Sequence, residues 1–63
     1  MALFLIQGYN SDMTELVSEE RKEFERTEDA LIEAYDKADS YDVVVLLRQG
    51  CISHSFKKIA KFY

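Results

Sequence analysis

The chain has 63 residues, of which 48% are hydrophobic and 32% are charged, and its net charge is −4. A domain of roughly 60 residues already buries only about 60% of its unfolded surface, so we expect residues 1–63 to form a single domain with a small core. This composition is typical of globular rather than disordered proteins. No apolar stretch approaches the roughly 18 residues of a membrane-spanning helix, so the sequence predicts no membrane protein.

The charged residues are segregated along the chain. All twelve acids lie between Asp12 and Asp42 with four basic residues, which leaves this segment at −8, whereas the chain after Val43 carries +4. Such asymmetry indicates an interaction surface of defined sign. Cys51 is the only cysteine. A lone thiol fits a reducing compartment, so we expect a cytoplasmic protein.

The first predicted element is a strand at residues 3–9, which are rich in β-forming side chains. The opening apolar run lacks the basic leader and cleavage site of a signal peptide. A turn follows at residues 8–12, where Asn10, Ser11 and Asp12 can close the backbone through side-chain hydrogen bonds.

Residues 13–24 fit two structures. Leu16, Glu20 and Phe24 match a helical stripe, whereas Leu16-Val17 followed by charged residues matches an edge strand. Charged edge strands discourage unwanted pairing between sheets. We expect the edge strand.

A helix is predicted from Thr27, with Thr27 as the N-cap and Glu28 and Asp29 complementing the helix dipole. Its apolar face would carry Leu31, Ala34, Tyr35 and Ala38, which follow the helical spacing. Glu33 and Lys37 have the i, i+4 spacing of a stabilising ion pair. The helix would end near Asp39-Ser40.

The run from Val43 to Leu47 is uniformly apolar and predicts a central strand buried on both faces. A single helix covers only one face of a sheet, so the other face needs a second cover. The candidates are a twin subunit, a partner, or the charged segment 13–24 folded back as a helix.

Gly50 can take the positive φ of a tight hairpin after Gln49, and residues 51–56 would form the returning strand. The tail is ambiguous. Phe56, Ile59, Ala60 and Tyr63 recur at helical spacing, but a continuing strand would place Phe56, Ala60 and Phe62 on one face. The predicted fold is therefore two-layer α+β, with three or four mainly antiparallel strands, one principal helix and room for a short C-terminal helix.

The sequence favours a non-enzymatic protein without a cofactor. Cys51 and His54 are three residues apart, which on a strand places them on opposite faces, and together they supply only two ligands for a metal. Gly8 and Gly50 are the only glycines, so no glycine-rich phosphate loop exists. The tail interleaves lysines with aromatic residues, as single-stranded nucleic acid binding requires, which keeps a nucleic-acid-binding module as an alternative.

Residues 24–34 (Phe-Glu-Arg-Thr-Glu-Asp-Ala-Leu-Ile-Glu-Ala), followed by Tyr41-Asp42-Val43-Val44-Val45, resemble small accessory proteins of tailed bacteriophages, many of which run strand, Thr-capped helix, strand. The resemblance implies a host-takeover or anti-defence protein acting in the host cytoplasm, which inhibits a bacterial enzyme or defence complex by covering its surface. Protein binding, with a homo-oligomer as one form of it, is thus the leading function, through two groups of candidate residues: Phe56, Lys57, Lys58, Lys61, Phe62 and Tyr63 in the tail, and Glu28, Asp29, Glu33 and Asp36 on the helix.

Overall fold

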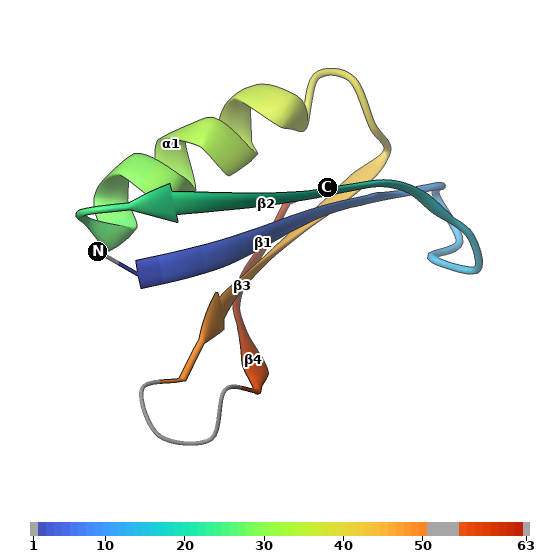
Figure 1. Cartoon of the computed structure of the whole chain (residues 1–63). Helices are drawn as coiled ribbons and strands as arrows, with labels where there is room; N and C mark the ends of the chain where they lie inside the picture. The colour runs from blue at the N-terminus through green and yellow to red at the C-terminus, as the bar shows by residue number, and fades with distance from the viewer. Residues whose placement is uncertain (1, 51–54, 63) are drawn as a thin grey trace.

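The computed structural model describes residues 2–50 and 55–62. Within them, four strands form one antiparallel sheet in the order β2-β1-β3-β4, and the helix α1 lies on one face of it (Figure 1). This confirms the predicted two-layer α+β fold. The elements in chain order are β1 (Ala2–Tyr9), β2 (Leu16–Phe24), α1 (Thr27–Lys37), β3 (Val43–Gln49) and β4 (Phe56–Phe62).

The two central strands, β1 and β3, are the apolar runs of the sequence. Phe4, Leu5 and Ile6 of β1 are buried, and so is the stretch Val43–Leu46 of β3. Alternate side chains of these strands point to opposite faces of the sheet, so burial of consecutive residues means burial on both faces. The prediction of a central strand buried on both faces is confirmed for Val43–Leu46, and β1 is buried in the same way.

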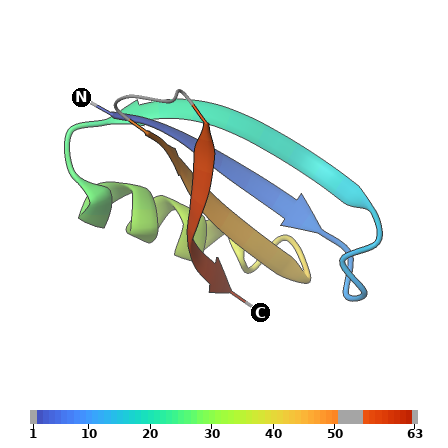
Figure 2. The same ribbon diagram turned by 90° about the horizontal axis from the view of Figure 1, so that it is seen from below.

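Residues 16–24 form the edge strand that the sequence favoured, and the helical alternative is wrong. β2 pairs with β1 from Ala2↔Phe24 to Tyr9↔Leu16, with a bulge near Gly8. Figure 2 shows β2 at the outer side of the sheet, opposite β4. The turn before β2 depends on Asn10, whose Oδ1 accepts hydrogen bonds from the backbone N–H groups of Thr14 (3.0 Å) and Glu15 (3.3 Å).

The start of α1 differs from the prediction by one residue. Arg26 is the N-cap residue, with extended φ and ψ of −129° and 140°, and its carbonyl already accepts the amides of Asp29 and Ala30. Thr27 therefore lies inside the first turn, where its hydroxyl cannot cap the helix, and no side chain caps it. Glu28 and Asp29 do lie in the first turn, at the positive end of the dipole.

The buried face of α1 is an alanine stripe. Ala30 and Ala34 are fully buried against Phe4, Ile6, Val44 and Leu46. Tyr35, predicted on this face, is 68% exposed. The small side chains let the helix lie close to the sheet, and Tyr35 is about 100° further round the helix than Ala34, so it falls at the flank.

The β3–β4 connection also differs from the sequence prediction. Gly50 does not take a positive φ, and its N–H donates to the carbonyl of Ser55 at 2.9 Å, so the hairpin is wider than a two-residue turn. Strand pairing starts at Phe56 opposite Gln49. The rest of the predicted returning strand, residues 51–54, lies outside the described residues.

The tail is a strand, so the C-terminal helix alternative is wrong. β4 contains a bulge at Ile59, because Leu46 pairs with Ala60 while Leu47 pairs with Lys58. One extra residue reverses which side chains face the helix. Ala60 and Phe62 pack against the core under α1, whereas Phe56 lies on the opposite face, which contradicts the prediction that the three share a face.

Gly8 is required because Tyr41 occupies the space beside it. A Cβ placed on Gly8 would lie 2.7 Å from Cγ of the Tyr41 ring. Tyr41 belongs to the loop between α1 and β3 and packs against the core. The ring thus closes the end of the core where β1 turns towards β2.

We therefore expect Gly8→Ala to lower the free energy of unfolding by about 1–3 kcal/mol, because the Tyr41 ring must move from a packed position. Chemical denaturation measures this. In a Tyr41→Ala background the same change should cost much less, since the obstructing ring is gone. Equal costs in the two backgrounds would show that the clash is not what selects glycine.

Candidate functional site

The face of the sheet away from α1 is partly covered by the chain's own side chains. Leu5 of β1 and Val45 of β3 point to this open face and are buried. Above them, the guanidinium carbon of Arg21 lies 5.7 Å from the centre of the Phe56 ring. Since Arg21 is on one edge strand and Phe56 on the other, this pair spans the sheet above its central strands. The predicted alternative cover, segment 13–24 as a helix, is wrong.

A row of hydrogen-bonded polar side chains covers the part of the open face around Gln7. The Tyr9 hydroxyl donates to Oε1 of Gln7 at 2.8 Å, and Nε2 of Gln7 donates to Oε1 of Glu19 at 3.0 Å. Such amphipathic side chains shield apolar surface with their stems while their polar ends stay in water. The open face is thus less apolar than the sequence of β1 and β3 indicates.

Replacing Arg21 by Ala should lower the free energy of unfolding by about 0.5–1.5 kcal/mol, because both the cation–π contact and the cover over Leu5 are lost. Glu23→Ala on the same face of the same strand serves as the control and should change it by less than about 0.5 kcal/mol. Thermal denaturation compares the two variants. Equal effects would mean that Arg21 covers nothing in solution.

On the helix side of the sheet, ion pairs connect α1 to β2. Lys37 lies 2.8 Å from Oε2 of Glu20, and Lys22 lies 3.3 Å from Oε1 of Glu33. Lys22 also approaches Glu20 at 3.8 Å. The predicted Glu33–Lys37 pair is thus replaced by bridges between the helix and the strand. Glu33, a candidate partner-binding residue, is instead part of this internal connection.

The bridge between Glu20 and Lys37 shifts both groups. The hydrogen bond from Lys37 lowers the pKa of Glu20 below its ordinary value, and the same hydrogen bond raises the pKa of Lys37 above its ordinary value. Both side chains remain partly exposed, so solvent screening keeps the energy of the pair small.

The contribution of Glu20 to stability should disappear at acid pH. Because its folded pKa is lower than its unfolded pKa, the contribution is complete above the unfolded value and is lost as pH falls through the folded value. Glu20→Gln should be less stable than the parent at pH 7, by at most about 0.5 kcal/mol, and should equal it below both pKa values. A difference that is the same at pH 7 and pH 2.5 in denaturation curves would contradict the bridge.

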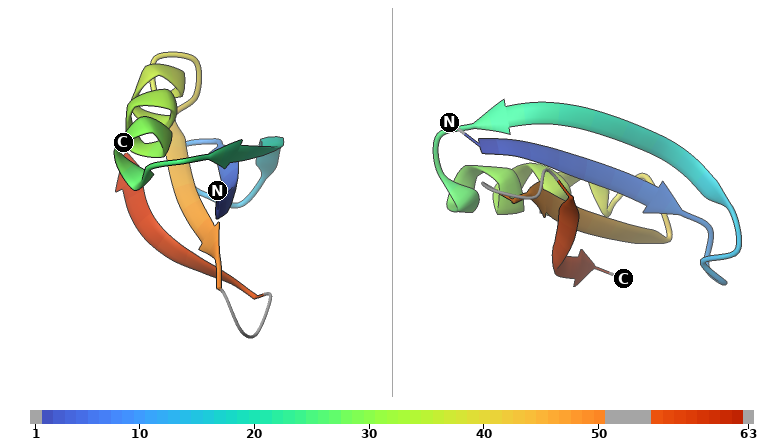
Figure 3. Two further views of the ribbon diagram at one scale, coloured as in Figure 1. Left: turned by 60° about the vertical axis from the view of Figure 1, so that its left-hand side comes forward. Right: turned by 60° about the horizontal axis from the view of Figure 1, so that its bottom comes forward.

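Exposed apolar side chains lie on α1 and on β4, and these two elements meet at a contact between Tyr35 and Phe62. We call this the α1–β4 surface and define it by Ile32, Tyr35, Ile59 and Phe62. Ile32 is 61% exposed, Tyr35 68% and Ile59 41%. The Tyr35 and Phe62 rings meet edge to face with centroids 5.8 Å apart. In the left view of Figure 3, the arrowhead end of β4 lies beside the helix.

The bulge at Ile59 separates the three lysines of β4. Lys57 pairs with Arg48, whose guanidinium lies over the Phe4 ring on the helix side of the sheet. Lys58 pairs with Leu47 and Lys61 with Val45, so both lie on the open face. The candidate lysines of the tail therefore belong to two different surfaces.

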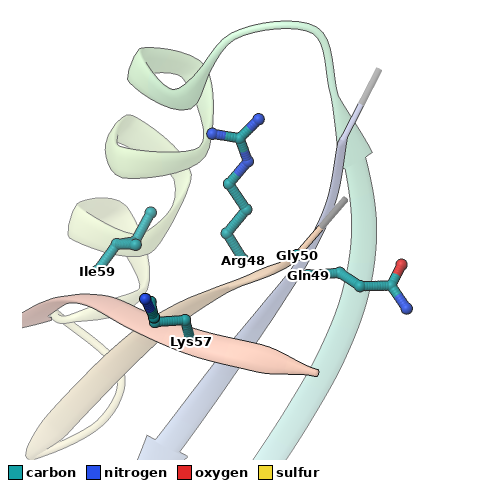
Figure 4. A pocket seen from close by; sticks show the side chains of 5 residues that line it. All are labelled: Arg48, Gln49, Gly50, Lys57 and Ile59. Carbon is teal, nitrogen blue, oxygen red and sulfur yellow. The ribbon is translucent and has the colours of Figure 1, made fainter. Parts of the chain in front are cut away.

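A hollow of about 280 Å³ lies at the end of the β3–β4 hairpin, lined by Arg48, Gln49, Gly50, Lys57 and Ile59 (Figure 4). In Figure 4, Arg48 and Ile59 point towards the helix side, and Gln49 points away from it. The hollow thus adjoins the α1–β4 surface and shares Ile59 with it.

The acidic candidates of α1 are dispersed. Glu28, Asp29 and Asp36 are exposed, and Glu28 lies 3.7 Å from Arg26. At about 100° per residue, Glu28 lies beside Ile32 on the β4 flank, whereas Asp29 and Asp36 lie on the outer side of the helix. Of the acids proposed from the sequence, Glu28 is the one nearest the α1–β4 surface.

The described residues contain no group of three or more side chains that could hold a metal ion. Nor does any helix among them have the length and apolar character needed to cross a membrane. Three residues considered in the sequence, Cys51, His54 and the candidate Tyr63, lie outside the described part of the chain.

Sequence reasoning missed Ile32, Ile59 and Arg48 as surface residues. Ile32 carried a readable signal, because it is an apolar residue on the side of the helix opposite Ala30 and Ala34. Ile59 had none, since its exposure follows from the bulge.

Comparison with protein families, with curated proteins and with solved structures found no match for this chain.

Proposed function

We propose that this protein is a non-enzymatic protein-binding domain that uses the α1–β4 surface. The observation that carries the proposal is the contact between the exposed Tyr35 ring and the half-buried Phe62 ring, with exposed Ile32 one turn before Tyr35 on the helix and exposed Ile59 on the same strand as Phe62. Contiguous exposed apolar side chains rimmed by charges are typical of protein interaction sites. The rim consists of Glu28 on the helix, Arg26 at the N-cap before it, and Lys57 on the strand.

Tyr35 would be the centre of this interface. Tyrosine is enriched at binding hot spots because its ring contributes a large contact area while its hydroxyl keeps a hydrogen-bond partner. Here the edge-to-face contact with Phe62 holds the ring in place before binding. A ring that is already positioned loses less conformational entropy when a partner covers it.

The more specific form of the proposal is an inhibitor of a bacterial host enzyme or defence complex, acting in the cytoplasm by covering the target's surface. Its support is the resemblance of residues 24–34 and the strand after them to small phage accessory proteins. Inhibition by occlusion requires a binding surface but no reactive group. The exposed acids and lysines near the interface would then orient the target.

The nucleic-acid alternative has weaker support. Stacking on bases requires open aromatic faces, but Phe56 is covered by Arg21 and Phe62 is in contact with Tyr35. The lysines of β4 also point to two faces of the sheet, so they do not form one basic track.

The proposal predicts that Ile32→Ser combined with Tyr35→Ser abolishes capture of a specific protein from bacterial lysate, because two anchors of the interface are lost. The control is Leu16→Ser with Val17→Ser, which removes apolar side chains of similar exposure, 44% and 56%, from the far edge strand. Quantitative pull-down with mass spectrometry should show a species that the parent and the control retain and the first variant loses at least about tenfold.

As a control, circular dichroism spectra should show that both double variants are folded. Loss of the captured species from the Leu16/Val17 variant alone would place the interface at the opposite edge strand, β2. Identical capture by all three proteins would refute the α1–β4 surface as the binding site.

A further inference from the structure

Two positive side chains lie directly opposite each other on the helix side of the β3–β4 hairpin. Arg48 pairs with Lys57 in the strand register, and both are exposed. Like charges placed directly opposite each other across two strands destabilise a sheet. The ion pairs recorded among residues 2–50 and 55–62 involve neither of them. An arrangement that costs stability, and that no carboxylate of the described chain relieves, indicates a site for an external anion.

The two cations line the same hollow, and one of them, Arg48, is held in place by a ring. The Arg48 guanidinium lies 5.9 Å from the centre of the buried Phe4 ring, which restrains its position. Ile59, displaced outward by the bulge, forms an apolar wall of the same 280 Å³ hollow (Figure 4). The site therefore combines a planar guanidinium, an ammonium and an aliphatic surface.

We propose that this hollow binds a carboxylate side chain from an acidic, partly apolar segment of the partner protein; this rests on the proposed protein-binding function. The fork of the guanidinium matches the two oxygens of a carboxylate, and Lys57 adds a second cation. Ile59 would contact the apolar residue next to the acid. Because Ile59 also belongs to the α1–β4 surface, the acidic segment lies at the edge of that interface.

A phosphate group would also be attracted to two cations. The aliphatic wall and the two covered rings, Phe56 and Phe62, favour a peptide over a nucleic acid. The two ligands are therefore compared in the same experiment.

The matched pair Lys57→Gln and Lys58→Gln tests the site. Both changes remove one charge from the same strand, but Lys57 is on the helix side and Lys58 on the open face. The probe is a fluorescein-labelled twelve-residue peptide in which Glu alternates with Leu and Phe, and its affinity is measured by anisotropy. We expect Lys57→Gln to weaken binding about tenfold and Lys58→Gln less than about twofold.

Three results would overturn the proposal. Equal weakening by both variants would mean that only overall charge attracts the peptide. Equal affinity for a peptide with Gln in place of Glu would exclude a carboxylate site. Tighter binding of a labelled single-stranded oligonucleotide than of the acidic peptide, with the same dependence on Lys57, would identify a phosphate site instead.

The melting temperature provides an independent test of whether Arg48 and Lys57 are neighbours. Lys57→Glu turns the repelling pair into an ion pair with Arg48 and should raise the melting temperature by about 2–4 °C while abolishing binding of the acidic peptide. Lys58→Glu, opposite Leu47, should not raise it. A variant that is more stable yet does not bind cannot have lost binding by unfolding. No rise for Lys57→Glu would show that the two cations are not neighbours in solution.

The outcome separates this inference from the proposed function. If the acidic peptide fails to bind while capture of a lysate protein still depends on Ile32 and Tyr35, the anion site is wrong and the interface stands. If the peptide binds through Lys57 while capture is independent of Ile32 and Tyr35, the anion site is confirmed and the α1–β4 surface is not the interface.

Discussion

The arrangement of this protein depends on one short helix that packs through alanine. Eleven residues of α1 span about 17 Å, whereas the eight residues of β1 extend about 27 Å. Ala30 and Ala34 bring the helix close to Phe4, Ile6, Val44 and Leu46, while Ile32 and Tyr35 are turned outward. The helix therefore covers only part of the length of the sheet and presents Ile32 and Tyr35 to solvent.

The second face of the sheet shows how so small a chain shields apolar strands without a second layer. Side chains on the two edge strands, Arg21 and Phe56, reach towards each other over the central strands. Both edges also carry features that oppose the addition of further strands: consecutive charges on β2, and lysines with a bulge on β4. This makes the helix side, rather than the open face or the edges, the better supported interaction surface.

The sequence was informative where one local pattern decided the structure. The apolar runs at β1 and β3 and the charged run at β2 predicted strands in their correct roles, because burial on two faces and exposure at an edge each leave a direct mark on composition. The sequence-based prediction failed where strand pairing decides which face of the sheet a side chain occupies. The bulge at Ile59 reversed the faces of Phe56 and Lys57, and no residue type in β4 signals an extra residue.

The helix shows the same limit. Two sets of residues have helical spacing: Leu31, Ala34, Tyr35 and Ala38, and also Ala30, Ala34 and Ala38. Periodicity alone therefore does not decide which set faces the sheet, because the two faces differ by only about half of the 100° step between successive residues. The sheet selects the smaller residues, since close packing excludes the Tyr35 ring. Thr27 was misplaced because Arg26 already provides the first helical carbonyl. The candidate residues of the tail do not share one surface, because the bulge places Phe56 and Lys58 on the open face and Lys57 and Phe62 on the helix side.

The most direct test of the α1–β4 surface is site-specific photocrosslinking. A benzophenone amino acid replaces Tyr35 in one protein and Val17, on the far edge strand, in another, and each is irradiated in bacterial lysate. We expect a discrete crosslinked product, identified by mass spectrometry, from position 35 and not from position 17. The same product from both positions, or a product from position 17 alone, would contradict the claim that the partner binds where the helix meets β4.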